Sequence, residues 1–133
     1  MPEPHAKSFR VGRSATGLGL FATRPIGKGE TIVEYSGTRI PTRLARELDR
    51  RRANKYLFEI DRRWTIDGRT RENLARYVNH ACRPNAEAVL RRGRMLFVAA
   101  KRIPTGAEIT IDYGEEHMQL YFRDGCRCAA CKG

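Results

Sequence analysis

The sequence contains no long uninterrupted run of apolar residues. Its opening segment, MPEPHAKSFR, includes two prolines and an acidic side chain and leads into no apolar stretch. We therefore predict neither a secretory signal nor a membrane-spanning helix. The expected protein is soluble and intracellular, in the cytoplasm, nucleoid or nucleus, and makes no membrane contact.

Internal repeats and low-complexity tracts are also missing. The chain has 133 residues, enough for one domain but not for a catalytic domain together with a separate recognition domain. With 41% hydrophobic and 31% charged residues, the composition is typical of a globular fold and argues against a disordered chain. One compact unit must therefore carry the whole function.

Acidic residues are scarce relative to basic ones: 15 Asp and Glu stand against 26 Lys and Arg, a net charge of +11. This balance favours contact with DNA, RNA or a nucleoprotein, although a hydrated basic surface would give the same charge. The densest basic cluster is Arg43, Arg46, Arg50, Arg51 and Arg52. At helical spacing the first three share one face that either contacts phosphates or remains hydrated.

Cysteine is rare, and its placement is uneven. Three of the four cysteines, Cys126, Cys128 and Cys131, lie in one short stretch, and Cys82 lies far upstream. Without a secretory signal, such close thiols favour a metal over disulfides, because their thiolates can bind one zinc ion tetrahedrally. Free thiols or a redox pair remain the alternative.

Short apolar stretches separated by glycine turns predict a mostly β domain. The predicted strands are rich in β-branched and aromatic residues. They cover residues 19–23, 30–37, 55–61, 64–67, 87–91, 95–100 and 108–113. Two short helices are predicted, over residues 41–52, where Leu44 and Leu48 lie one helical turn apart, and over residues 115–123.

Three motifs are candidates for a functional site. TGLGLF at 16–21 allows close backbone approach to a ligand, but no long helix follows it as a dinucleotide site would require. RYVNHACRPN at 76–85 is a polar segment among apolar strands, which is either a ligand site or a loop that satisfies buried backbone groups. EITIDYG at 108–114 is a strand that ends at a tyrosine.

Taken in order, GLGLFAT, EYSG, YLFEID, WTIDGRTRENLARYVNHACRPN, EITIDYG and CRCAACKG resemble the SET-domain methyltransferases over nearly the whole chain. The resemblance implies a mostly β, β-clip-like SET-domain fold of small β-sheets with short helices. It also implies a knot-like C-terminal threading, in which the NHxCxPN segment passes under another loop. The SET domain would cover residues 1–114, and a post-SET-like flap with the cysteine cluster would cover residues 115–133.

The activity implied by the resemblance is transfer of a methyl group from S-adenosylmethionine to a lysine side chain of another protein. Gly17, Leu18 and Gly19 match the loop whose backbone holds the methionyl end of this cofactor. Asn79 and His80 match the pair that contacts its amino group and adenine. The resemblance thus assigns the cofactor site to two segments far apart in the sequence.

The lysine side of the implied site is aromatic. Tyr113 matches the tyrosine whose hydroxyl lies beside the transferring methyl group and the target nitrogen, and Tyr35 is the second tyrosine assigned to catalysis. Tyr56, Phe58 and Ile111 are assigned to the substrate-lysine channel. Ile111 stands where the family commonly has Phe or Tyr and has no hydroxyl to hold a water molecule, so we predict di- or trimethyl-lysine as the product. The alternative is a core residue at 111, with Tyr35 or Tyr56 closing the same space.

Cys82 matches the cysteine that joins a C-terminal trio around a structural zinc ion, here Cys126, Cys128 and Cys131. Two features depart from the family. The last two cysteines are closer together than in many relatives, which makes the zinc loop tight. The stretch 37–56 is short, which leaves little room for the insert with which many relatives read a peptide.

The residue types suit this chemistry. Methyl transfer from a sulfonium to nitrogen is an in-line displacement, so an enzyme must mainly hold donor and acceptor about 3–3.5 Å apart. A lysine ammonium, with a pKa of about 10.4 in water, must first lose its proton, which burial in a narrow aromatic channel favours. Tyr113 would then align and stabilise rather than act as a base, because the pKa of a phenol is about 10.

The expected partner is a protein that presents a lysine, such as a histone, a histone-like bacterial protein or a ribosomal protein. Contact with nucleic acid or nucleoprotein through the basic surface, and a homodimer, are further expectations. Two other functions remain open: a catalytically silent SET-like module that binds peptide in the same groove, and a zinc-dependent nucleic-acid-binding domain. The first should lack Tyr113 or Asn79, and the second has no use for the NHACRPN loop.

Overall fold

The computed structural model describes residues 7–122, apart from the side chain of Glu116. Its secondary-structure elements are short, and strands outnumber helices. In chain order they are β1 (Phe9–Ser14), β2 (Gly17–Ala22), β3 (Thr31–Tyr35), β4 (Thr38–Pro41), α1 (Thr42–Arg50), β5 (Leu57–Glu59), β6 (Trp64–Asp67), the 3-10 helix η1 (Leu74–Tyr77), β7 (Asn79–His80), β8 (Ala86–Arg91), β9 (Arg94–Ala99), β10 (Glu108–Ile111) and α2 (Glu115–Tyr121). No helix in this part of the chain is long and apolar enough to cross a membrane.

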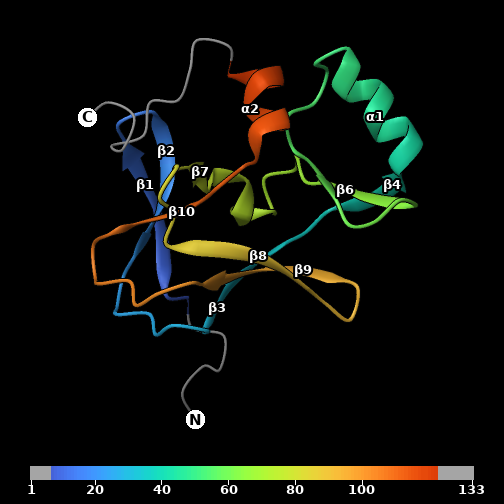
Figure 1. The fold of residues 1–133 in the computed structure, drawn as a ribbon. Coiled ribbons are helices and arrows are strands. Elements are labelled where there is room, and N and C mark those ends of the chain that lie inside the picture. Colours follow the sequence, from blue (N-terminus) through green and yellow to red (C-terminus); the bar gives the residue numbers. More distant parts are fainter. Residues whose placement is uncertain (1–6, 123–133) are drawn as a thin grey trace.

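The strands form three small sheets (Figure 1). The strand order is β1-β2-β10-β7 in the first sheet, β3-β9-β8 in the second and β4-β6-β5 in the third. Both helices lie in the upper part of the view, α1 beside the third sheet and α2 after the end of β10. The prediction of a mostly β fold of small sheets with short helices is confirmed.

The central strand of the first sheet, β10, joins two segments that are far apart in the sequence. β7 runs parallel to β10, with Asn79 opposite Thr110 and His80 opposite Ile111. β2 pairs antiparallel with β10 at its other edge. The glycine-rich strand and the Asn-His pair are therefore held on either side of the strand that leads to Tyr113.

Asn85 ties the segment after β7 to the same strand. Its side-chain amide donates to the backbone carbonyl of Glu108 (2.8 Å) and accepts from the backbone N–H of Thr110 (2.9 Å). These bonds pair backbone groups of β10 with a side chain from the segment that follows β7. The polar 76–85 segment is thus fixed by side-chain hydrogen bonds.

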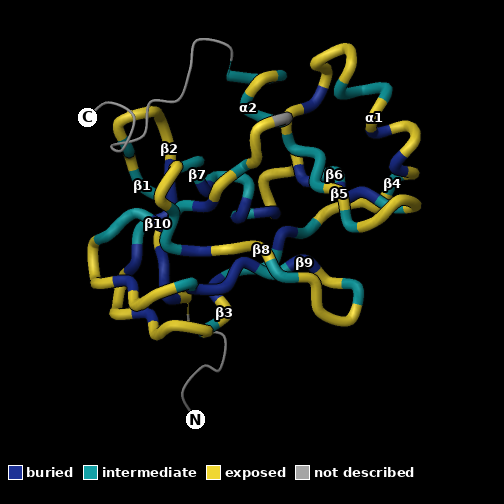
Figure 2. The backbone as a smooth tube through the Cα atoms, viewed as in Figure 1, coloured by how far each residue is buried: buried dark blue, intermediate teal, exposed yellow. Residues whose placement is uncertain are grey.

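The hydrophobic core is formed mainly by residues of β2, β9 and β10 and of the loops that follow β2 and β9 (Figure 2). Its largest fully buried apolar side chains are Leu20, Ile26, Val78, Phe97, Ile103 and Ile109. Burial of a side chain of this size contributes roughly 1.5–3 kcal/mol relative to exposure. The core therefore gives the first sheet a rigid base beneath the site.

All seven predicted strand regions contain a strand, but β1, β4 and β7 were not predicted. β1 reads FRVGRS, in which Phe9 and Val11 are the only apolar side chains. It is a strand because it pairs along its whole length with β2, from Phe9 opposite Ala22 to Ser14 opposite Gly17. The 76–85 segment, predicted to be irregular, contains the end of η1 and the short strand β7.

α1 buries its small side chains rather than its leucines. Ala45 is 3% exposed and Thr42 is 1% exposed, whereas Leu44 is 48% exposed. The Thr42 hydroxyl also shares a buried hydrogen bond of 2.9 Å with the hydroxyl of Thr65 on β6. The spacing of Leu44 and Leu48 therefore located the helix but not the face that packs.

Candidate active site

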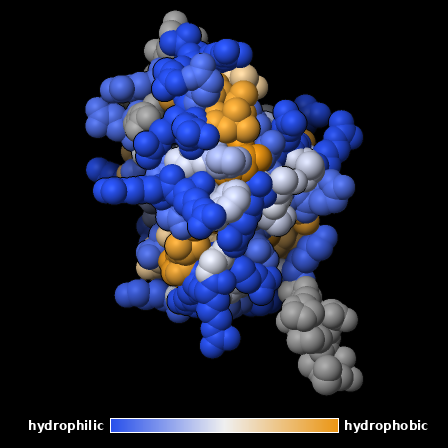
Figure 3. Space-filling model, turned by 90° about the vertical axis from the view of Figure 1, so that its right-hand side faces the viewer, coloured by the Kyte–Doolittle hydropathy of each residue, from blue (hydrophilic) through white to orange (hydrophobic). Residues whose placement is uncertain are grey.

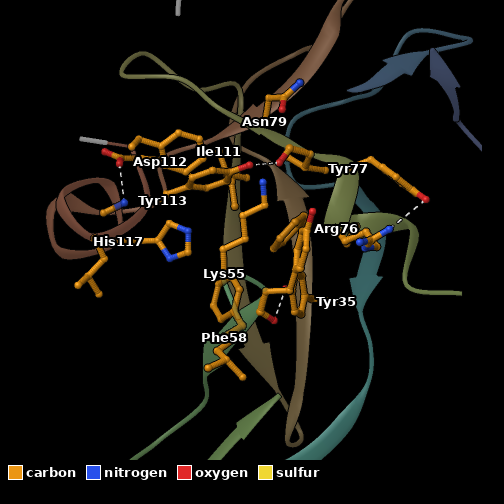
Figure 4. Close-up of a pocket in the computed structure, with 18 of the residues that line it drawn as sticks. Tyr35, Lys55, Phe58, Arg76, Tyr77, Asn79, Ile111, Asp112, Tyr113 and His117 are labelled. Carbon is orange, nitrogen blue, oxygen red and sulfur yellow. Dashed lines mark hydrogen bonds between the residues drawn. The ribbon is translucent and has the colours of Figure 1, made fainter. Parts of the chain in front are cut away.

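A cavity of about 700 Å³ lies between the ends of β7 and β10, the helix α2 and the segment that enters β5 (Figure 4). Seven of the predicted site residues line it. These are Leu18, Tyr35, Tyr56, Phe58, Asn79, Ile111 and Tyr113. Gly17, Gly19 and His80 adjoin them in the chain but do not line the cavity. The structure thus brings together side chains that the sequence spreads over nearly one hundred positions.

Tyr113 is held at both its ring and its backbone. Its hydroxyl donates to the backbone carbonyl of Val78 at 2.5 Å, and its backbone N–H donates to Nδ1 of His80 at 2.9 Å. Burial raises the pKa of Tyr113 well above that of a free phenol, and the nearby Tyr56 and Glu108 raise it further. Tyr113 therefore presents a neutral, oriented hydroxyl to the cavity.

His80 supports Tyr113 from behind the cavity wall. Because its Nδ1 accepts the Tyr113 N–H, the proton of the neutral imidazole is on Nε2, which lies 3.6 Å from the sulfur of Cys82. The side chain of His80 is only 8% exposed, and its ring centroid lies 5.3 Å from that of Tyr113. The structure gives His80 a positioning role, and its predicted cofactor contact stays a prediction.

Asn79 connects the two predicted cofactor segments. Its side-chain nitrogen lies 3.0 Å from the carbonyl of Leu18, 2.7 Å from a carboxylate oxygen of Glu108 and 3.2 Å from the hydroxyl of Ser14. Three acceptors around this atom fix the orientation of the amide. Among residues 7–122 the Asn79 carbonyl oxygen has no hydrogen-bond partner. That oxygen is available to a ligand.

The glycines of β2 permit this close approach. A Cβ atom at Gly19 would lie 2.5 Å from a Glu108 carboxylate oxygen and 3.1 Å from the Asn79 amide nitrogen. Gly17 has a φ of +125°, which favours glycine, and a Cβ there would meet no atom within 4 Å. β2 is therefore packed tightly against Asn79 at Gly19, whereas Gly17 faces open space.

The opposite part of the cavity is aromatic. The Tyr35 hydroxyl donates to the carbonyl of Tyr56 at 2.6 Å, and the Tyr35 ring lies 5.0 Å from that of Phe58 between centroids. Desolvation raises the pKa of Tyr35 well above its usual value, so this phenol also stays neutral. Ile111 is 5% exposed and lines the same space.

Arg76, Lys55 and His117 are among the lining residues that were not predicted. The Arg76 guanidinium lies 4.4 Å from the centre of the Tyr56 ring, and its Nε is buried without a hydrogen-bond partner among the described residues. Arg76 belongs to the quoted RYVNH block, so its sequence signal was present. His117 was detectable from its spacing, because it lies four residues after Tyr113 at the start of a predicted helix.

The helix α2 covers one side of the cavity through an aromatic series. The His117 ring lies 5.2 Å from the Tyr113 ring and 4.9 Å from the Tyr121 ring between centroids. The Tyr121 hydroxyl lies 2.9 Å from both a carboxylate oxygen of Asp49 and the carbonyl of Asn54, so it is placed to donate to either. Desolvation lowers the pKa of His117, which makes its imidazole neutral at neutral pH. α2 is thus tied to the segment that enters β5.

The predicted zinc site lies mostly outside the described residues. Cys126, Cys128 and Cys131 belong to the part of the chain that the structure does not describe. Cys82 is exposed after β7, beside His80. Within residues 7–122 no group of three or more His, Cys, Asp or Glu side chains is arranged to hold a metal ion. The tetrad stays a prediction.

The face of the molecule beside α1 is mainly hydrophilic (Figure 3). Three of the five arginines in the predicted basic cluster form ion pairs with carboxylates. These pairs are Arg46–Glu59, Arg50–Glu47 and Arg51–Glu47. The pairs are exposed, so each contributes only about 0–1 kcal/mol and can exchange partners. The cluster is nevertheless less positive than its sequence indicates.

Residues 17–114 match the family model described as the SET domain, which is most of the chain. The chain belongs to the SET-domain family. The matched region begins at β2 and ends one residue after Tyr113, so it contains the glycine strand, Asn79 and the aromatic wall. The helix α2 (Glu115–Tyr121) and Phe122, which cover one side of the cavity, lie beyond the matched residues.

This SET domain is similar to those of much longer proteins. It is 36% identical over 105 residues to "Histone-lysine N-methyltransferase trithorax" of Drosophila virilis, covering 73% of this chain and 3% of that protein. It is 34% identical over 122 residues to "Histone-lysine N-methyltransferase 2D" of Homo sapiens, covering 86% and 2%. Over 140 aligned positions it is 34% identical to "Histone-lysine N-methyltransferase, H3 lysine-4 specific" of Emericella nidulans, covering 96% and 12%. The chain spans only a small part of the length of these relatives.

Proposed function

We propose that the chain is an S-adenosylmethionine-dependent protein-lysine N-methyltransferase. The observation that carries this proposal is the neutral, doubly held Tyr113 in a cavity with Asn79 on one side and aromatic rings on the other. The names of its SET-domain relatives support the same reaction. A silent peptide-binding module would not need a buried, oriented hydroxyl at this position.

The residues around Asn79 fit the methionyl end of the cofactor. The Asn79 carbonyl oxygen can accept a hydrogen bond from a ligand ammonium group, and Leu18, whose carbonyl bonds to the Asn79 amide, lines the same cavity. A side chain at Gly19 would displace Asn79 from this arrangement. S-adenosylmethionine would supply a methyl group on a positively charged sulfur, which is the electrophile that a lysine amine requires.

The chain's own residues then orient the acceptor and exclude water. Tyr35, Tyr56 and Phe58 border an apolar space that favours a neutral amine over an ammonium group. The Tyr113 hydroxyl and the Val78 carbonyl are fixed relative to each other, so they give the incoming amine a polar end point. Holding the nitrogen about 3–3.5 Å from its target carbon can supply much of the rate enhancement.

We propose a histone or another basic, nucleic-acid-associated protein as the substrate. In a chain of net charge +11, the cavity is lined by more acidic than basic side chains, with Asp49, Glu59, Asp112 and Glu115 against Lys55 and Arg76. A locally acidic rim attracts a basic segment despite the overall charge. Such a substrate would place the enzyme beside DNA or RNA, where its remaining basic surface can contact phosphates.

We further propose that the product is di- or trimethyl-lysine. Ile111 lines the cavity without a hydroxyl that could hold a water molecule in the space that a second methyl group needs. Mass spectrometry of a long reaction should show more than one methyl group on the target lysine. Ile111→Tyr should shift the product toward monomethyl-lysine and still allow the first transfer; monomethyl product from the wild type would contradict this proposal.

The C-terminal flap is proposed to bind one structural zinc ion through Cys82, Cys126, Cys128 and Cys131. The support is the thiol chemistry of the four residues and the exposed position of Cys82 near His80, which holds Tyr113. Metal analysis of active protein should give about one zinc per chain. Active protein that contains no zinc would contradict the proposed zinc site.

A homodimer also remains a proposal, which sedimentation of the purified protein can decide.

The experiment that tests the proposed function is transfer of label to protein. Purified chain is incubated with S-adenosylmethionine labelled in its methyl group and with a whole-cell extract, and the labelled proteins are identified. Label should enter one or a few basic proteins. If S-adenosylmethionine binds in calorimetry but no protein is labelled, the chain is a binding module; if nucleic acid binds and S-adenosylmethionine does not, the nucleic-acid-binding domain is favoured.

A further inference from the structure

Lys55 is the one lysine among residues 7–122 whose side chain lines the cavity. It directly precedes Tyr56, and in Figure 4 its side chain extends into the cavity toward Tyr113. Its Nζ lies 5.5 Å from the centre of the Tyr56 ring and 5.9 Å from the centre of the Phe122 ring. The ammonium group of the chain itself is therefore placed beside Tyr56, one of the aromatic residues proposed to receive a substrate lysine.

The backbone on both sides of Lys55 is fixed. Asn54 is 7% exposed; its side chain accepts from the Tyr56 N–H (2.9 Å) and donates to Asp67 (2.9 Å). The Asn54 carbonyl also lies 2.9 Å from the Tyr121 hydroxyl of α2. Because these contacts hold the Cα position, only the rotamers of the Lys55 side chain decide how far its nitrogen reaches.

Among residues 7–122, no described carboxylate pairs with the Lys55 ammonium. Asp49 also lines the cavity, but its carboxylate is placed to accept the hydroxyl of Tyr121. An ammonium group in a salt bridge would have to break it before reacting, and Lys55 has no such bond to break.

We propose that Lys55 is a methyl acceptor in its own chain. The inference rests on the proposed methyltransferase function. The exposed Lys55 ammonium releases one proton to water, and the Nζ lone pair then forms a bond to the methyl carbon. The bond from that carbon to the sulfonium sulfur breaks, and its electron pair stays on sulfur. The products are N-methyl-Lys55 and S-adenosylhomocysteine, and the step is intramolecular.

The test uses the purified full chain with labelled S-adenosylmethionine and no other protein. Intact mass and peptide mapping should place the methyl groups on Lys55, at a rate per chain that does not depend on protein concentration. Lys55→Arg keeps the charge but removes the acceptor and should abolish the label. Lys101→Arg is the matched control, since Lys101 is an exposed lysine away from the cavity, and it should keep the label.

A second measurement needs no methyl transfer. Lysines of the resting protein are acetylated with acetic anhydride, and the rate at each site is read by mass spectrometry. S-adenosylhomocysteine, which has no methyl group to give, should slow acetylation of Lys55 about tenfold at about ten times its Kd. Acetylation of Lys28 and Lys101 should not change, because neither lines the cavity.

The outcomes separate this inference from the proposed function. If extract proteins are labelled and Lys55 is not, self-methylation is wrong and the methyltransferase function stands. If nothing is labelled, both are wrong. Methyl groups spread over several lysines, or a rate per chain that rises with protein concentration, would exclude the intramolecular reaction. If Lys55→Ala weakens S-adenosylmethionine binding and wild-type Lys55 carries no methyl group, Lys55 is a cofactor contact instead.

Discussion

The two walls of the cavity are held by different forces. The donor wall, formed by β2, β7 and β10, is fixed by strand pairing and by the Asn79 amide, which bonds to Leu18 and Glu108. In the acceptor wall, formed by residues 54–58 and α2, the aromatic side chains meet through ring contacts. The hydrogen bonds of the Tyr35, Asn54 and Tyr121 side chains hold mainly the backbone of residues 54–56. Hydrogen bonds demand strict geometry, whereas ring contacts tolerate small shifts. The fixed wall suits an invariant cofactor, and the adaptable wall suits a variable protein substrate.

The largest loss of activity is expected on substitution of Tyr113, which lies where the two walls meet. Tyr113→Phe keeps the ring and the His80 contact but loses the hydroxyl beside Val78. Loss of an oriented donor at the reacting centre should lower kcat by about 10²–10³-fold. The Kd of S-adenosylmethionine, measured by calorimetry, should change little.

Tyr77→Phe is the matched control, because Tyr77 also lines the cavity but its hydroxyl accepts a hydrogen bond from the Arg76 guanidinium. Its kcat should change far less than that of Tyr113→Phe, because the Tyr77 hydroxyl only accepts a hydrogen bond from the Arg76 guanidinium. Equal losses in the two variants would mean that Tyr113 has no special place in the reaction.

The next largest effect is expected on cofactor affinity, when Asn79 of the donor wall is replaced. Asn79→Ala removes the carbonyl offered to a ligand ammonium and the bond to Leu18. A hydrogen bond to a charged group contributes about 1.5–3 kcal/mol, so the Kd of S-adenosylmethionine should rise about 10–100-fold. Calorimetry on the purified variant measures this directly.

Asn85→Ala tests whether a loss of stability in the donor wall by itself changes the affinity for the cofactor. The Asn85 side chain bonds to the backbone of Glu108 and Thr110, and Asn85 does not line the cavity. Its loss should lower the free energy of unfolding by about 1–3 kcal/mol, because buried backbone groups lose their partners. The cofactor Kd should hardly change. If Asn79→Ala binds S-adenosylmethionine as tightly as the wild type does, the donor wall is not the wall that binds the cofactor.

The two walls also differ in how well the sequence predicted them. The arrangement of the donor wall follows from short motifs, because Gly19 lets β2 pack tightly against Asn79 and the Asn79 amide bonds to the Leu18 carbonyl. The strands β1 and β7 were missed, since their pairing partners and not their own apolar patterns make them strands. Long-range pairing of this kind is not visible in local periodicity.

On the acceptor wall the sequence indicated the aromatic residues but not the contacts by which α2 covers them. Tyr35, Tyr56 and Phe58 were expected near the channel, and they do line the cavity. The contact of Tyr121 with Asp49 joins residues 72 positions apart, and no local pattern predicts it. The same holds for Lys55, which looks like an ordinary surface lysine until the fold places it beside Phe122.

A smaller effect tests the tie between α2 and the acceptor wall. Tyr121→Phe removes the hydroxyl that reaches Asp49 and Asn54. The free energy of unfolding should fall by about 1 kcal/mol, and the KM for the protein substrate should rise while the cofactor Kd stays constant. Denaturant unfolding and steady-state kinetics measure the two parts. A changed cofactor Kd with an unchanged KM would place α2 on the donor side.

The smallest effect concerns pH. Burial raises the pKa of Tyr113 above its value in the unfolded chain, so the folded state holds a proton that the unfolded state releases. Stability should therefore be full below about pH 10 and fall as the pH rises further. The free energy of unfolding of Tyr113→Phe, measured with denaturant, should fall less steeply with alkaline pH than that of the wild type. Up to about pH 10 the phenolate absorbance of the variant should match the wild type. An extra phenolate in the wild type below that pH would mean that Tyr113 is not buried as a neutral group.

The most direct measurement is the chemical identity of the methylated amino acid. Protein labelled from S-adenosylmethionine in a cell extract is hydrolysed, and the labelled amino acids are separated. The label should be in methylated lysine with the wild type and should be almost absent with Tyr113→Phe. Label in methylated arginine or histidine, or equal methyl-lysine with both proteins, would contradict a lysine methyltransferase built around Tyr113.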